Sequence, residues 1–206
     1  MEARLFPEGT IPFYTTPEFF EAHPWITPAH QLGHKQRTKM VAALIRWVVL
    51  EYEPTSLVDL GCGDGSLLQE ISQLPIPMWG YDAGSENVDI ATKNGLDVRK
   101  TDLISGTPIE WADLIVATEM VEHLVDPHGF IKNLPGNLLV LSSPSAETAD
   151  WHYEHHAWAW DLPGYREMVE NAGWTVTEQI DCAAEVNRHN GEEREQRFQA
   201  LVAVRR

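Results

Sequence analysis

The sequence predicts an α/β fold in which helices cover both faces of a mostly parallel sheet. Three observations lead to this prediction. Short apolar runs alternate with segments of helical periodicity between residues 56 and 142. A glycine cluster, Gly61–Gly65, directly follows the first apolar run and precedes a helical segment. Beyond Gly173, two segments alternate apolar and polar residues, which favours a closing antiparallel strand pair.

Each element has its own sequence signal. Residues 1–33 are rich in proline and aromatic residues without long periodicity, so we expect an arm with one short helix near Pro17–Ala22, followed by a domain over 34–206. The expected strands are Ser56–Leu60, Met78–Tyr81, Leu96–Lys100, Asp113–Ala117, Asn137–Ser142, Trp174–Asp181 and Phe198–Val204. The expected helices are His30–Glu51, Ser66–Leu74, Ser85–Asn94, Glu119–Leu124, Pro127–Leu134 and Asp161–Asn171. Residues 143–160 and 183–197 are polar or aromatic and are expected to form loops.

Composition narrows the function classes. With 206 residues and 43% apolar content, the chain is large enough for one domain with a sizeable core. No apolar core follows Met1–Arg4 and no run of about 20 apolar residues occurs, so we expect neither a signal peptide nor a membrane span. Two cysteines, Cys62 and Cys182, are too few for a disulfide framework and favour the reducing cytoplasm. Nothing in the composition specifies an oligomeric state.

The net charge of −16 opposes electrostatic binding to a nucleic-acid backbone. The segment 146–154 adds three acids, Glu147, Asp150 and Glu154, which we expect to form an acidic rim. We therefore expect a small-molecule substrate rather than a nucleic acid.

The glycine cluster lies in the sequence Val58-Asp-Leu-Gly-Cys-Gly-Asp-Gly65, and the next apolar run ends at Asp82. Glycines let the backbone turn tightly and approach a ligand, and a carboxylate at Asp82 can accept hydrogen bonds from ribose hydroxyls. The third glycine comes one residue too early for a dinucleotide fingerprint. Acids at Asp59 and Asp64 would repel a pyrophosphate but suit a cofactor with an ammonium and a sulfonium.

These residues resemble the cofactor site of the class I S-adenosylmethionine-dependent methyltransferases. The resemblance covers roughly residues 34–206 and implies a doubly wound, Rossmann-like sheet of seven strands that ends in a reversed strand pair. It implies S-adenosylmethionine as cofactor, held at Asp59, Gly61, Cys62, Gly63, Gly65, Asp82, Asp102 and Thr118. In the family, an acid or amide at the position of Asp102 reads the adenine amino group; a surface-turn acid is the alternative.

A second group of polar residues lies after the fourth and fifth expected strands. Glu119, Glu122 and His123 are spaced i, i+3 and i+4, so they share one face of the expected helix. His155 and His156 lie in an aromatic loop beyond the next strand. Because neighbouring parallel strands end at the same edge of the sheet, we expect the two groups to meet near the cofactor.

Three functions fit these residues. E-x-x-E-H-x-x-D-P resembles the ubiquinone-pathway O-methyltransferases, which implies a small-molecule hydroxyl acceptor. His123 would then be the general base, positioned by the acids Glu119 and Glu122, with His155 and His156 as second choices of base.

The same string resembles the metal-dependent small-RNA terminal 2′-O-methyltransferases. That resemblance implies that Glu119, Glu122, His123 and His156 bind manganese, iron, cobalt, zinc or magnesium and act on a ribose or other diol. In the third alternative, the chain is a non-catalytic cofactor-binding scaffold. In either enzyme, the N-terminal arm would close over the acceptor.

Overall fold

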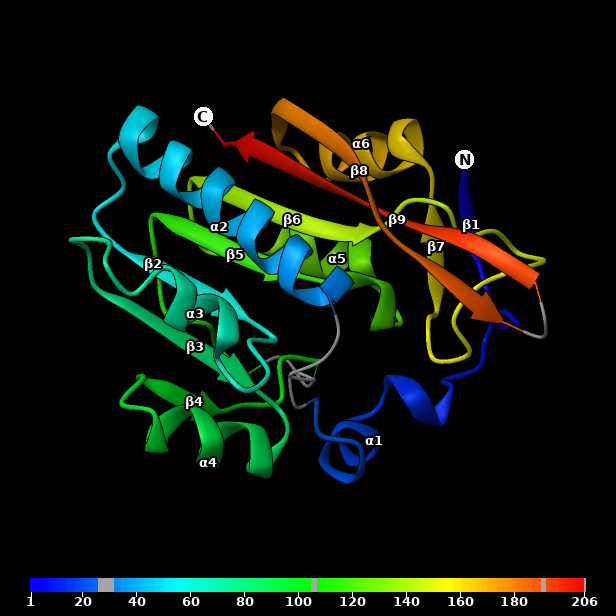
Figure 1. The fold of residues 1–206 in the computed structure, drawn as a ribbon, viewed down its shortest axis with the longest axis horizontal. Helices are drawn as coiled ribbons and strands as arrows, with labels where there is room; N and C mark the ends of the chain where they lie inside the picture. Colours follow the sequence, from blue (N-terminus) through cyan, green and yellow to red (C-terminus); the bar gives the residue numbers. More distant parts are fainter. Residues whose placement is uncertain (26–31, 105–106, 190–191, 206) are drawn as a thin grey trace.

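The computed structural model describes residues 1–25, 32–104, 107–189 and 192–205. Its main sheet has seven strands in the order β4-β3-β2-β5-β6-β9-β8 (Figure 1). Neighbours from β4 to β6 pair in parallel, whereas β9 runs antiparallel to both β6 and β8. The strands are β2 (Leu57–Leu60), β3 (Met78–Asp82), β4 (Val98–Lys100), β5 (Leu114–Thr118), β6 (Leu138–Pro144), β8 (Thr175–His189) and β9 (Glu192–Val204). The predicted fold class is confirmed.

Two apolar cores lie on opposite faces of this sheet. Along β5, Leu114 and Val116 belong to one core, while Ile115 and Ala117 belong to the other, because successive side chains of a strand point to opposite faces. The first core also takes its residues from α2 (Leu32–Tyr52), α3 (Ser66–Glu70) and α4 (Ser85–Lys93). The second takes them from α5 (Pro127–Lys132) and α6 (Leu162–Asn171), which lie behind the sheet in Figure 1. The sheet is therefore doubly wound, and the carboxyl ends of its parallel strands share one edge.

The N-terminal arm is more regular than the sequence predicts. Its short helix α1 (Pro17–Ala22) is present as predicted, with the Thr16 hydroxyl accepting a hydrogen bond from the Phe19 N–H. However, β1 (Glu2–Arg4) pairs antiparallel with β7 (Trp158–Trp160), inside the segment expected to be a loop. A three-residue strand carries little signal of its own, and its partner lies more than 150 residues away in the chain, so only the tertiary fold creates this small sheet.

Two other predictions were wrong. Residues 183–189 and 192–196 are not a loop but continue β8 and β9, whose ladder runs from Ala183 opposite Arg197 to His189 opposite Glu192. The backbone N–H and C=O groups of each strand pair with those of the other strand there, so the hairpin continues even though its residues are mostly polar. In place of the helix predicted over Glu119–Leu124, a single 3-10 turn covers Val121–His123.

Residues 190–191, which belong to the segment predicted as a loop, and the predicted helix start at His30 lie outside the described residues. Among the helices of the described ranges, we find none with the length and apolar character needed to span a membrane.

Candidate active site

The glycine loop after β2 has a backbone that only glycine accommodates easily. Gly61, Gly63 and Gly65 have φ values of 72°, 56° and 79°, in the left-handed region. A Cβ at Gly65 would lie 2.4 Å from Leu96 Cδ1, and one at Gly61 would lie 2.7 Å from Met120 Cγ. The three predicted glycines therefore shape a tight loop at the carboxyl end of β2, which leaves room for a ligand.

Asp82, at the end of β3, connects this loop to the start of α4. Its buried carboxylate accepts hydrogen bonds from the N–H of Gly63 at 2.8 Å, the N–H of Gly84 at 2.9 Å and Asn87 Nδ2 at 2.8 Å. A carboxylate offers about four acceptor positions, so one remains for a ribose hydroxyl. The position of Asp82 is therefore compatible with a nucleoside cofactor, although it also holds the loop in shape.

The other predicted cofactor residues surround the same cavity. Asp59 is buried, and its oxygens have no hydrogen-bond partner among the described residues. Burial is the larger cause that raises the pKa of Asp59 to about 8, and the charge of Asp82 is the smaller one. Cys62 is buried against Gly80, and burial raises the pKa of its thiol. Asp102 and Thr118 also border the cavity, and Asp102 accepts a hydrogen bond from the Ile104 N–H at 2.9 Å in a turn.

Three side chains of the second predicted group lie close together. One potential ligand atom from each of Glu122, His123 and His156 lies within 4.8 Å of the others. The two imidazole rings are 4.8 Å apart between centroids, and His123 Nδ1 lies 3.0 Å from the carbonyl oxygen of His155. This carbonyl can only accept, so Nδ1 carries the proton and His123 Nε2 keeps a lone pair.

Burial dominates the electrostatics of these three groups. It raises the pKa of Glu122 well above its ordinary value, with the charge of Glu119 adding to the effect. It lowers the pKa of His123 to about 3 and that of His156 to about 4. Neither Glu122 oxygen has a hydrogen-bond partner among the residues that the structure describes. Neutral imidazoles beside an unpaired buried carboxyl make a set of groups suited to a proton or a cation.

Glu119 is not one of the three groups whose ligand atoms converge, although its charge acts on both Glu122 and His156. Its φ of 51° places it in the left-handed region directly after β5, so it does not share a helix face with Glu122 and His123. Its carboxylate accepts hydrogen bonds from the Ser142 hydroxyl at 2.8 Å and from Arg37 at 3.1 Å. The structure thus places Glu119 at the cavity but engages its charge with Arg37 of α2.

The arm lies over the cavity. Phe19 is 4.8 Å from the His155 ring, and Phe20 is 5.8 Å from the His123 ring, between centroids. Trp25 would be 3.2 Å from a Cβ placed on Gly63, so it covers the glycine loop. His123 and His155 therefore both lie against the arm, whereas His156 is buried.

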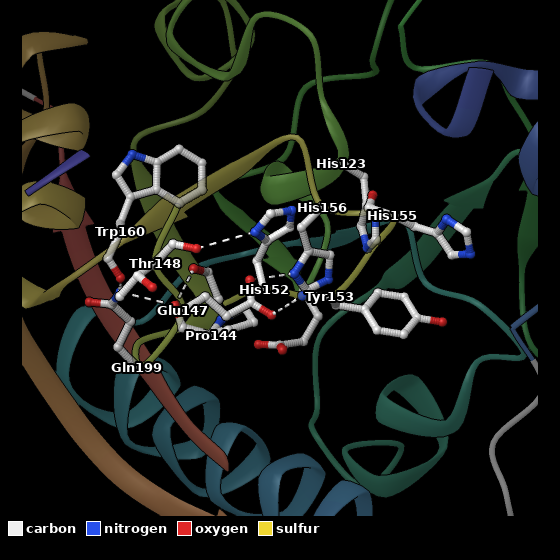
Figure 2. A network of polar contacts seen from close by, with 12 residues as sticks. His123, Pro144, Glu147, Thr148, His152, Tyr153, His155, His156, Trp160 and Gln199 are labelled. Carbon is white, nitrogen blue, oxygen red and sulfur yellow. Dashed lines mark hydrogen bonds and ion pairs between the residues drawn. The ribbon is translucent and has the colours of Figure 1, made fainter. Parts of the chain in front are cut away.

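Sequence reasoning missed the role of Glu147. The acidic rim was expected to include it, yet Glu147 is 8% exposed and its carboxylate lies 2.6 Å from His156 Nδ1 (Figure 2). Burial raises the pKa of Glu147 to about 7, although the Tyr153 N–H opposes this shift. Asp150 and Glu154 remain exposed. The spacing of nine residues between Glu147 and His156 carries no helical or strand signal, so the sequence offered no indication of this contact.

Comparison with known proteins agrees with this architecture. A family model described as "Methyltransferase domain" matches residues 30–179. A ubiquinone biosynthesis O-methyltransferase from Parvibaculum lavamentivorans is 28% identical over 121 residues, covering 53% of this chain and 48% of the relative. One from Bradyrhizobium diazoefficiens is 32% identical over 98 residues, covering 42% and 39%. The chain thus spans about half the length, or less, of these curated relatives.

Solved structures show the same fold. A magnesium protoporphyrin IX methyltransferase from Synechocystis PCC 6803 with bound SAM superposes with a TM-score of 0.65 at 17% identity, covering 97% of this chain and all of the other. An S-adenosylmethionine-dependent methyltransferase from Clostridium acetobutylicum gives 0.59 at 14% identity, covering 82% and 92%. From the matched family model, the sheet order and the glycine loop followed by Asp82, we conclude that this chain belongs to the class I S-adenosylmethionine-dependent methyltransferases.

Proposed function

We propose that this chain transfers a methyl group from S-adenosylmethionine to a hydroxyl oxygen of a small molecule. One observation carries the proposal: a cavity of about 790 Å³ is bordered both by the glycine loop and by Glu122, His123 and His156. This volume lies within the usual range for small-molecule sites. The curated relatives named ubiquinone biosynthesis O-methyltransferase support an oxygen acceptor.

In this proposal the protein binds and orients the reactants and excludes water from them. The cofactor, when bound, supplies an electrophilic methyl group on a sulfonium. Asp82 and the glycine loop hold the nucleoside end, whereas Asp59, whose pKa burial raises to about 8, is largely protonated at neutral pH and adds no full charge there. Phe19, Phe20 and Trp25 of the arm cover the opening, which excludes water and restricts the orientation of the acceptor. The division into an arm over 1–33 and a catalytic domain over 34–206 is part of this proposal.

The acceptor hydroxyl must lose its proton, and His123 is the proposed base. Its Nδ1–H donates to the His155 carbonyl, so Nε2 presents a lone pair. A pKa of about 3 keeps the imidazole neutral at physiological pH but also makes it a weak base on its own. The imidazolium, once formed, would favour ionisation of Glu122, whose raised pKa keeps it protonated beside a neutral ring, and this mutual stabilisation within 4.8 Å gives the buried acid a role in the reaction.

A metal-assisted version is the second candidate, and Glu122 is the observation that favours it. Its buried carboxyl finds no hydrogen-bond partner in the part of the chain that the structure describes, which costs free energy, and a divalent cation would pair with it. Glu122, His123 and His156 provide the carboxylate and imidazole ligands that manganese, iron, cobalt or zinc accept. Bound there, a cation would lower the pKa of an acceptor hydroxyl, so that no separate base is needed. Glu119 would join this set only by leaving Arg37.

Release of S-adenosylhomocysteine, measured against a panel of phenols, catechols and ribose diols, tests the proposal. We expect turnover with at least one hydroxyl acceptor, and loss of at least about 100-fold in kcat for His123→Ala. His128→Ala, a partly exposed histidine paired with Glu2, is the matched control. Turnover that survives chelation by EDTA supports the metal-free base; loss that manganese or cobalt restores supports the metal. Cofactor binding without turnover on any acceptor would favour the scaffold alternative and contradict the proposal.

A further inference from the structure

Glu147 is a buried carboxylate without a part in the methyl transfer proposed above. It lies in the loop between β6 and β7, and its side chain is 9% exposed. Acids are rarely buried to this extent unless a specific partner offsets the loss of hydration. Its two oxygens divide their contacts: Oε2 faces His156 Nδ1 at 2.6 Å, and Oε1 accepts the Tyr153 N–H at 3.0 Å.

The backbone of the loop is folded so that this contact forms. The Thr148 N–H donates to the Trp151 carbonyl at 2.8 Å, and the His156 N–H donates to the Tyr153 carbonyl at 3.0 Å. The loop then returns to the cavity, where the Ala157 N–H donates to the Glu122 carbonyl at 2.7 Å. Figure 2 shows Glu147 at the centre of these contacts, between the loop backbone and the histidines. The loop therefore holds both Glu147 and His156 in place.

The contact has a chemical consequence for His156. An ionised carboxylate can only accept, so at pH values above the Glu147 pKa of about 7 His156 Nδ1 donates to Oε2 across the 2.6 Å contact, while the Tyr153 N–H occupies Oε1. The neutral ring then carries its proton on Nδ1, and Nε2 is left as the basic nitrogen for the group formed with Glu122 and His123. His123 is oriented in the same way by the His155 carbonyl. Two independent acceptors thus select the same tautomer in both histidines.

We infer that Glu147 is a positioning residue, which orients His156 and fixes its Nδ1–H tautomer so that Nε2 faces the reaction site. This inference deepens the proposed function and rests on it for the effect on turnover. The tautomer itself is a property of the protein without substrate, so the two ideas can fail separately. Acids that hold a functional histidine in this way typically contribute 10- to 100-fold to activity or metal affinity.

The test compares three variants with the wild type by nitrogen-15 NMR of labelled histidine, at about pH 8, where an unperturbed imidazole is neutral. Glu147→Gln keeps an acceptor oxygen, so we expect the Nδ1–H tautomer of His156 to persist. Glu147→Leu removes it, so we expect the Nε2–H tautomer. Asp150→Leu, in the exposed part of the same loop, is the matched control and should leave the His156 signals unchanged.

Kinetics add a second readout. We expect kcat to fall by about 10- to 100-fold in Glu147→Leu, with partial rescue in Glu147→Gln and an unchanged KM for S-adenosylmethionine. A wild-type His156 protonated on Nε2 would overturn the inference, even if Glu147→Leu failed to fold. So would an Nδ1–H tautomer and normal kcat in a folded Glu147→Leu protein. If no acceptor is turned over at all, the proposed function fails while the tautomer shift still decides the role of Glu147.

Discussion

Substituting Gly65 by alanine should destabilise the protein for two separable reasons. The residue has a φ of 79°, and a left-handed backbone costs a residue with a Cβ about 1–2 kcal/mol. The new Cβ would also lie 2.4 Å from Leu96 Cδ1 and 3.1 Å from Ala91 Cβ, and crowding of this kind costs about 1–3 kcal/mol. The sum predicts a loss of about 2–5 kcal/mol in the free energy of unfolding.

Gly95 provides the matched control, because its φ is 83° but an added Cβ there meets no atom of the described residues within 4 Å. Gly95→Ala should therefore cost only the backbone contribution, about 1–2 kcal/mol. Thermal and urea denaturation of both variants measure the difference between their free energies of unfolding, which should be about 1–3 kcal/mol. Each kcal/mol corresponds to a change of about 2–4 °C in Tm for a domain of this size. Equal stability of the two variants would refute the claim that the third glycine is required by close packing against Ala91 and Leu96.

Three further outcomes are expected. Asp82→Ala should weaken S-adenosylmethionine binding by about 1.5–3 kcal/mol in calorimetry, because it removes charge-assisted hydrogen bonds. The exposed control Asp89→Ala should bind the cofactor normally. Preserved binding in Asp82→Ala, or binding of NAD instead, would contradict the cofactor assignment. Hydrogen bonds from Ser85, together with Lys100, lower the pKa of Glu21 to about 2, so this acid stabilises the docked arm at neutral pH and loses that effect as pH falls from 4.5 towards about 2. The Tm gap between wild type and Glu21→Gln should accordingly narrow on acidification, whereas a constant gap, or the same behaviour in the exposed control Glu18→Gln, would argue against this contact. Finally, the charge of −16 predicts blank gel shifts with generic duplex DNA and RNA at about 0.15 M salt, and tight binding of either would return attention to an RNA acceptor.

The sequence by itself determined the sheet and the cofactor edge. Strands β2 to β6 and helices α3 to α6 lie within a few residues of their predicted positions, because apolar periodicity and helix-ending glycines act locally along the chain. The left-handed loop Gly61–Gly65 and the acid Asp82 were predictable for the same reason. Short-range spacing specifies a strand–turn–helix unit, and parallel strands necessarily bring their carboxyl ends to one edge.

Only the tertiary structure decided which polar groups meet at that edge. Glu119 and Glu122 have similar sequence surroundings, yet Glu119 is engaged by Arg37 from a distant helix, whereas Glu122 is buried with no hydrogen-bond partner among the described residues. Glu147 looks like a surface acid in the sequence, but the loop encloses it against His156. Such contacts depend on how side chains from separate segments are buried and oriented. Composition and periodicity describe only local sequence, whereas the environment of each of these residues is formed by parts of the chain far from it in sequence.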